Sequence, residues 1–168
     1  MDKILRSKVE EIGDLIKSKD YRMAKEKAND LISEYPDNSI PYNMLCSIHI
    51  LLKDFNQAIS IANENITKIG KDYLSYFYLG QAEAALGNQD AAIDNIISCI
   101  NQNKDFPIAY TILRNLLHNT PSNFDLKNKG LEEIYLYGLE KNHMKIDEIF
   151  HLILRLYLSS YQLSNLSF

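Results

Sequence analysis

A carboxylate and a histidine near the C-terminus are spaced as metal ligands are in some helical proteins. Glu148 and His151 form an E-x-x-H pair within a predicted helix. In di-iron helix bundles, two such pairs and two further carboxylates surround the metal ions. A solvated polar face explains one pair more simply, so we predict that the chain binds no metal. His49 and His118 stand beside apolar residues in predicted helices, where we expect them inside the fold or along a groove.

The sequence offers two thiols as nucleophiles, and neither lies in a motif for catalysis. Cys46 and Cys99 fall at small-residue positions inside predicted helices, where cysteine acts as a small buried hydrophobe. The sequence has no Cys-x-x-Cys, no glycine-rich phosphate loop and no Gly-x-Ser-x-Gly. We therefore expect a protein that is not an enzyme and that needs no cofactor.

A fixed spacing of 34 residues organises the elements that carry these side chains. It connects three leucines, three tyrosines and three alanines: Leu45, Leu79 and Leu113; Tyr42, Tyr76 and Tyr110; Ala24, Ala58 and Ala92. A period of this length is typical of helix pairs that stack on one another and share a continuous core. The sequence therefore predicts an all-α superhelix built from residues 5–38, 39–72 and 73–106.

Local signals mark where the predicted helices begin and end. Asp20 and Asp54 precede the second helix of the first two units, where a carboxylate can accept hydrogen bonds from free backbone N–H groups. Gln57 follows Asp54 by three residues, which predicts a capping box. Pro36 cannot continue a helix, and Gly70 permits the left-handed backbone that ends one.

Residues 107–168 complete a single domain as a divergent fourth unit. After Pro107 the pattern of a first helix recurs, and further helices are predicted over 125–141 and 145–162. The last of these carries an apolar stripe at helical spacing: Ile146, Ile149, Phe150, Ile153, Leu154, Tyr157, Leu158 and Tyr161. It either caps the open end of the stack, or packs on a following domain, or forms a homodimer through residues 145–168.

The third unit resembles the tetratricopeptide repeat (TPR) family. Its matching segments are Tyr76-Phe77-Tyr78-Leu79-Gly80, then Leu86-Gly87, then Ala91-Ala92-Ile93. Residues 5–38 and 39–72 fit the same pattern, with departures at Lys8, Glu11-Ile12, Cys46, His49 and, in the third unit, Glu83. The resemblance implies a right-handed superhelix of antiparallel helix pairs, a TPR-like α-solenoid with a C-terminal capping helix.

The resemblance also implies a binding groove along the first helix of each pair. Carried over position by position, the groove residues are Arg6, Val9 and Lys17; Ile40, Asn43, Ser47 and Ile50; Leu74, Phe77 and Gln81; Asn115 and His118. Well-known members grip the C-terminal carboxylate of a partner with a cluster of Lys, Arg and Asn, and that cluster does not occur here. Apolar anchors among amides instead suit an extended peptide or an amphipathic helix.

Charge and targeting signals limit the kinds of partner and compartment. The net charge is −4, so we expect no general attraction to nucleic acid or to anionic membranes. The most apolar run, Ile149–Leu158, is too short to span a bilayer and contains His151 and Arg155. The N-terminus lacks an apolar signal region and no disulfide framework is implied, so we expect a cytoplasmic protein.

These observations predict a non-catalytic module for protein–protein interaction, a scaffold with a peptide or helix in its concave groove. The alternative, from a different class, is the N-terminal regulatory or substrate-positioning TPR domain of a larger enzyme, such as a glycosyl- or sulfotransferase. A third interpretation is a self-assembling structural protein that uses its apolar C-terminal face. The groove could also be filled from within the chain, by the helix over 145–162 folding back into it.

Overall fold

The computed structural model describes residues 3–119 and 130–146. The described residues form eight α-helices and no strand, which confirms the predicted all-α class for this part of the chain. The helices are α1 (Lys3–Lys17), α2 (Tyr21–Glu34), α3 (Ser39–Leu51), α4 (Phe55–Lys68), α5 (Tyr73–Ala85), α6 (Gln89–Gln102), α7 (Pro107–His118) and α8 (Leu131–Glu140). In the described residues, no helix combines the length and the apolar character needed to cross a membrane.

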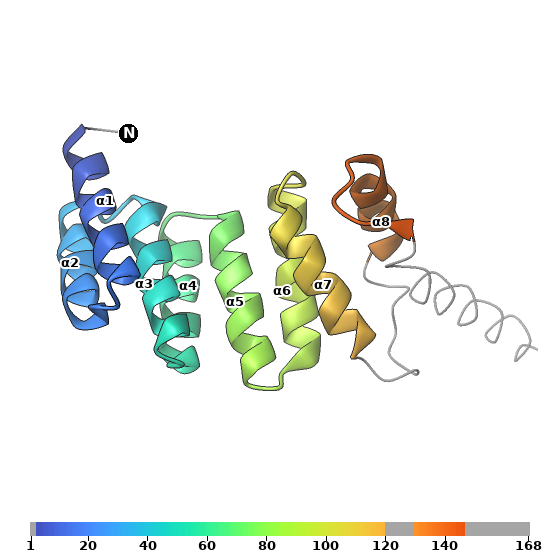
Figure 1. Ribbon diagram of the computed structural model, residues 1–168, viewed down its shortest axis with the longest axis horizontal. Coiled ribbons are helices and arrows are strands. Elements are labelled where there is room, and N and C mark those ends of the chain that lie inside the picture. Colours follow the sequence, from blue (N-terminus) through green and yellow to red (C-terminus); the bar gives the residue numbers. More distant parts are fainter. Residues whose placement is uncertain (1–2, 120–129, 147–168) are drawn as a thin grey trace, which may run out of the picture.

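The helices pack in the order of the chain and form an elongated row from α1 to α8 (Figure 1). From α1 to α7 each helix contacts the next, and α3 also contacts both α1 and α5. In Figure 1, α1 lies in front of α2 and α7 lies in front of α6. We call the surface made by α1, α3, α5 and α7 the odd-helix face; within it, α3 contacts both α1 and α5.

The residues at the 34-residue spacing form the interior of this row. Ala24, Ala58 and Ala92 are completely buried, and the three leucines Leu45, Leu79 and Leu113 are at most 4% exposed. The buried residues separate into two clusters, one in α1–α4 together with Leu79 of α5, and one in α5–α8. Small residues bring neighbouring helices close together, and the larger apolar side chains fill the space between the pairs.

Two buried tyrosines, which lie two repeats apart, make equivalent hydrogen bonds. The hydroxyl of Tyr42 donates to the carbonyl of Pro36 over 3.4 Å, and that of Tyr110 donates to the carbonyl of Lys104 over 3.0 Å. Each bond returns six residues along the chain, to the loop before the helix that carries the tyrosine. The two tyrosines therefore fix equivalent loops in the second and fourth units.

Two predicted helix ends are confirmed and one is wrong. Asp20 Oδ1 accepts from the backbone N–H of Met23 over 3.1 Å, and Gly70 has a φ of 109° after the end of α4. Asp54 stands at the N-cap position of α4 but makes no capping bond with its side chain. Its carboxylate instead accepts from His49, so the predicted capping box with Gln57 does not form.

The C-terminal prediction is correct in part. The helix predicted over 125–141 cannot run through Gly130, which has a φ of 64°, and α8 begins at Leu131. The left-handed region is one that glycine adopts freely and that interrupts a right-handed helix. Three further predictions concern residues that lie outside the described part of the chain, which ends at Ile146. They are the capping helix over 145–162, the homodimer surface at 145–168 and the Glu148–His151 pair. Of these residues, the structure describes Lys145 and Ile146.

Candidate functional site

The structure places the residues of the predicted groove at three levels of exposure along the odd-helix face. Four are exposed, Arg6, Lys17, Asn115 and His118; six are half-buried, Val9, Ile40, Ser47, Ile50, Leu74 and Gln81; and two are buried, Asn43 and Phe77. Exposed apolar side chains adjoin this set at Leu51, which is 48% exposed, and at Ile108, which is 54% exposed. A partner on this face would therefore contact mainly aliphatic and amide groups.

The aromatic ring of Phe77 packs inside the fold. It is 8% exposed and makes edge-to-face contacts with Phe106, at 5.1 Å between ring centroids, and with Tyr78, at 5.5 Å. Phe106 is the last residue of the third unit and the N-cap residue of α7. Phe77 thus holds the end of its own unit, where the fourth unit begins, and its ring offers little surface to a partner.

The amide of Asn43 is used within the chain. Its Nδ2 donates to Asp72 Oδ2 over 2.7 Å, and its Oδ1 lies 3.3 Å from the hydroxyl of Ser75. Asp72 also caps α5 by accepting from the backbone N–H of Ser75 over 3.1 Å, while Asn65 Nδ2 donates to Ser75 Oγ over 2.6 Å. This buried polar network joins α3, α4 and α5, so it fixes the angle between the second and third units.

Sequence reasoning missed three members of this network, although one local signal was available. Asp72 directly precedes the first helix of the third unit and Ser75 follows three residues later, a spacing typical of an N-terminal cap. Asn65 had no such signal, because its partner Ser75 comes from the next helix. Its Oδ1 has no hydrogen-bond partner in the described part of the chain.

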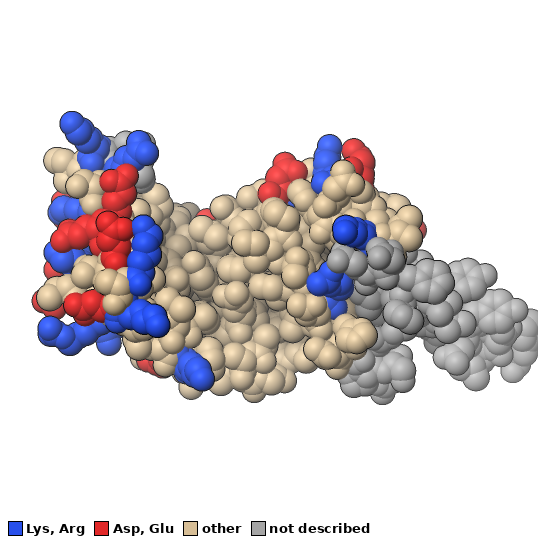
Figure 2. All heavy atoms as spheres, viewed as in Figure 1, with Lys and Arg blue, Asp and Glu red and all other residues tan. Residues whose placement is uncertain are grey.

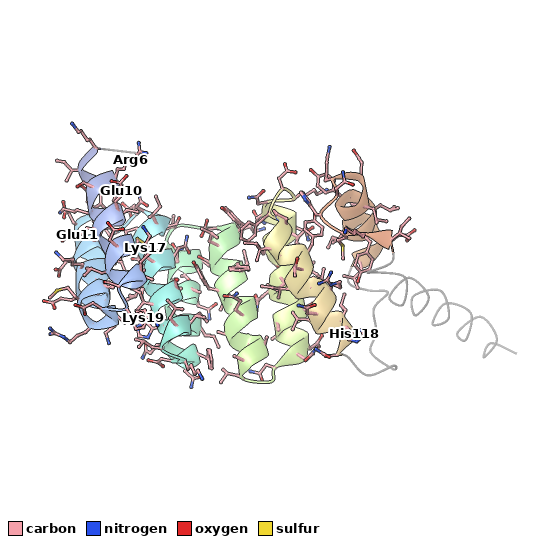
Figure 3. All side chains as sticks on the ribbon, viewed as in Figure 1. Arg6, Glu10, Glu11, Lys17, Lys19 and His118 are labelled. Carbon is pink, nitrogen blue, oxygen red and sulfur yellow. The ribbon has the colours of Figure 1, made fainter. Side chains whose placement is uncertain are left out.

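The two predicted groove cations are already neutralised by acids on their own helix. Arg6 Nε lies 3.2 Å from Glu10 Oε1, and Lys17 Nζ lies 2.8 Å from Asp14 Oδ1, a contact that raises the pKa of Lys17. Figure 3 shows Arg6 and Lys17 on α1 and His118 near the far end of the row. One small ligand group cannot contact both α1 and His118, so these residues do not form a compact site.

The middle of the viewed face carries few charged side chains. Figure 2 shows Lys, Arg, Asp and Glu gathered over α1 and α2 at one end and near α8 at the other. Between them, the surface over α3, α4 and α5 is almost entirely uncharged. Ser47 on α3 adds a polar group and bonds to the hydroxyl of Tyr78. Burial raises the pKa of Tyr78, and the bond to Ser47 opposes that rise. Electrostatics on this surface therefore favour a partner segment with little charge.

Both cysteines are confirmed as buried small hydrophobes. Cys46 and Cys99 are 0% exposed and make no disulfide. Burial raises the pKa of each thiol to about 12, so the nucleophilic thiolate is scarce at neutral pH. Neither cysteine has the exposed, electropositive surroundings of a catalytic thiol.

The histidines bring no metal ligands together in the described residues. No group of three or more His, Cys, Asp or Glu side chains there could hold a metal ion. Glu140 and His143 form a second E-x-x-H pair that sequence reasoning missed, but α8 ends at Glu140. His143 therefore lies in the turn beyond the helix, and its Nε2 is 3.7 Å from Asp105 Oδ1.

Comparisons with known proteins add no family to this description. No model of a known protein family matches the chain, and no curated protein matches it.

Proposed function

We propose that the chain is a non-catalytic protein-interaction module, a TPR-like α-solenoid that binds a peptide or helix of a partner protein on its odd-helix face. In this proposal α1, α3, α5 and α7 line the concave side of a right-handed superhelix, and the even-numbered helices support them. The partner is a protein rather than nucleic acid or a membrane, and the module acts in the cytoplasm.

The observation that carries the proposal is the combination of little charge and exposed aliphatic groups in the middle of the odd-helix face, over α3 and α5. Ile40, Ile50 and Leu74 are half-buried there, Leu51 is exposed, and Gln81 and Asn115 offer amides beside them. Aliphatic anchors exclude water from a bound segment, and amides can pair with its backbone. The 34-residue repeat supports the same function, because stacked helix pairs create extended binding surfaces.

A pull-down from native lysate tests this function with two matched variants. The first variant, Gln81→Arg with Asn115→Arg, places two cations on the odd-helix face without changing a buried residue. The second, Ser60→Arg with Gln102→Arg, adds the same charge at exposed positions of α4 and α6. Both are checked for helix content and thermal unfolding against the wild type before use.

The proposal predicts a protein that the wild type and the Ser60/Gln102 variant retain and that the Gln81/Asn115 variant loses. The purified partner should then bind the wild type directly, and at least about tenfold more weakly the Gln81/Asn115 variant, because a buried unpaired cation costs more than about 1.4 kcal/mol. Equal recovery with all three proteins would show that the odd-helix face is not the binding surface.

A further inference from the structure

A half-buried carboxylate lies at the edge of the odd-helix face where α3 and α5 begin. Asp72 is the N-cap residue of α5. Its Oδ2 accepts from Asn43 Nδ2 over 2.7 Å and from the backbone N–H of Ser75 over 3.1 Å, and the Ser75 hydroxyl lies 3.2 Å from the same oxygen. These donors come from α3 and from the first turn of α5, so they hold the carboxylate in one orientation between the two helices.

The second oxygen of this carboxylate has no partner in the described part of the chain. All of the hydrogen bonds to Asp72 are made at Oδ2, and Oδ1 accepts none from a described residue. Asp72 forms no ion pair with a described residue either, although Lys71 is adjacent in the chain and exposed. Oδ1 is not a buried atom, so it reaches the surface of the half-buried side chain. It can therefore accept from a donor outside the chain.

Capping alone does not require a negative charge at this position. In the preceding unit the N-cap residue of α3 is Asn38, whose neutral Oδ1 accepts from the backbone N–H of Ile40 over 2.9 Å. In the following unit it is Phe106, whose side chain makes no capping bond. The surface around Asp72, over α3, α4 and α5, is almost entirely uncharged in Figure 2. The carboxylate is thus particular to the junction of the second and third units.

Aliphatic side chains stand beside the carboxylate on both helices. Ile40 is the second residue of α3 and Leu74 is the second residue of α5, and both are half-buried. Ile40 precedes Asn43 by about one helical turn and Leu74 follows Asp72 by two residues, so each is within about a turn of the Asn43–Asp72 bond. Ile108, at the equivalent position of α7, is 54% exposed. A segment that reaches Oδ1 therefore meets apolar surface beside it.

We propose that the segment bound on the odd-helix face carries a lysine whose ammonium group donates to Asp72 Oδ1, between aliphatic residues that contact Ile40 and Leu74. This inference rests on the proposed function, because it names the chemistry of the segment bound on the same face. A lysine fits better than an arginine. A guanidinium pairs best with both oxygens of a carboxylate, whereas Oδ2 is already occupied, and an ammonium group needs one oxygen only.

Phage display of random short peptides on the full chain tests the proposal, because it supplies ligand sequences without a known partner. The same library is selected on the wild type, on Asp72→Asn and on Asp30→Asn, which removes an exposed carboxylate of α2. In Asp72→Asn the amide oxygen can replace Oδ2 in its hydrogen bonds, and the amide nitrogen then takes the place of Oδ1. We expect a shared lysine with aliphatic neighbours in peptides from the wild type and from Asp30→Asn, and no shared lysine in those from Asp72→Asn.

Calorimetry with synthetic peptides then measures the contribution of the lysine. One selected peptide is made with lysine, arginine or norleucine at the shared position. The wild type should bind the lysine peptide at least about tenfold more tightly than the norleucine peptide, the gain typical of one charge-assisted hydrogen bond, and more tightly than the arginine peptide. The difference between lysine and norleucine should disappear in Asp72→Asn and remain in Asp30→Asn. The comparison on the wild type stands even where a variant folds poorly.

The outcomes separate this inference from the proposed function. Equal binding of the lysine and norleucine peptides by the wild type, or a lysine preference that persists in Asp72→Asn, would overturn the inference and leave binding on the odd-helix face intact. Peptides that bind the Gln81/Asn115 variant as tightly as the wild type would instead contradict binding on that face. A library that yields no ligand of the wild type would count against both.

Discussion

The second and third units solve the same packing problem with opposite choices of residue. In the second unit Cys46 on α3 faces α4, where its Sγ lies 3.6 Å from the carbonyl of Ala58, and Ala62 lies one turn beyond. In the third unit Gly80 replaces Cys46 and Ile96 replaces Ala62. A methyl group added to Gly80 would meet Ile96 at 2.6 Å. The comparison indicates that the repeat preserves the summed volume at this helix contact while the individual residues change.

Exchanging these residues between the units should change the free energy of unfolding more than any other substitution proposed below. Ile96 is 0% exposed, so Ile96→Ala should destabilise the fold by about 2–5 kcal/mol through lost burial and the cavity that remains. Gly80→Cys should cost about 1–3 kcal/mol by overpacking. The double variant reproduces the pair found in the second unit, so it should lose clearly less than the sum of the two single costs. Urea denaturation of the four proteins measures this coupling, and strict additivity would contradict the volume exchange.

The two cysteines extend the comparison, because each unit buries one thiol. A pKa of about 12 in place of the ordinary 9.0 leaves about a thousandfold less thiolate at neutral pH. Iodoacetamide at about pH 8 should therefore modify Cys46 and Cys99 only as fast as the chain unfolds, followed by mass spectrometry with and without urea. Rapid modification of either thiol in the native protein would show that its unit opens locally.

The same shifts predict how stability changes at high pH. A folded-state pKa above the unfolded one means that the native state holds the proton more tightly, so stability is complete below the unfolded pKa near 9. The stability should fall as the pH rises from about 9 toward about 12. Burial also raises the pKa of Tyr110 to about 12, so this tyrosine lowers the stability over the same pH range. Urea midpoints measured from about pH 8 to about pH 11 should decline, and an increase over this interval would contradict the burial of these groups.

Equivalent tyrosines of the second and fourth units provide a smaller test. Tyr110→Phe removes a 3.0 Å hydrogen bond to the carbonyl of Lys104 and should cost about 1 kcal/mol. Tyr42→Phe removes a longer bond, 3.4 Å to the carbonyl of Pro36, and should cost less. Thermal unfolding of the two variants compares them directly. A larger loss from Tyr42→Phe would show that the second unit depends more on this loop than the bond lengths indicate.

Two glycines in helices should respond in opposite directions, with the smallest effects. A methyl group added to Gly13 would point into open space, with nothing within 4 Å, so Gly13→Ala should stabilise α1 by about 0.5–1 kcal/mol. Gly138 lies against Tyr110, whose ring would be 2.9 Å from an added methyl group, so Gly138→Ala should destabilise the fold. Urea titrations of the two variants measure both changes in stability. Destabilisation by Gly13→Ala would show that a further part of the chain covers α1.

Local and periodic features could be predicted from the sequence, whereas contacts between units could not. The 34-residue spacing placed the helices and the buried alanines correctly, because a helix face follows from residue period alone. It assigned Asn43 and Phe77 to a binding groove, whereas both side chains are buried in the fold. It could not show that Asp72 and Ser75 already occupy the amide of Asn43, or that Phe106 covers Phe77, since those partners lie about 30 residues away along the chain.

Asp54 shows the same limit at a helix end. Its position and the spacing to Gln57 satisfy the capping-box pattern, which is a rule about neighbours in sequence. In the fold, His49 from the preceding helix competes for the carboxylate and forms the bond instead. The resulting His49–Asp54 pair lines a cavity between α2 and α4, which no sequence pattern indicates.

Site-specific photo-crosslinking in cells tests most directly whether a partner protein binds the odd-helix face. A benzophenone amino acid replaces Gln81 on α5 in one protein and the exposed Ser60 on α4 in another. We expect a discrete crosslinked partner from position 81 that position 60 does not give. Crosslinks that are the same at both positions, or that form only from position 60, would contradict binding on this face.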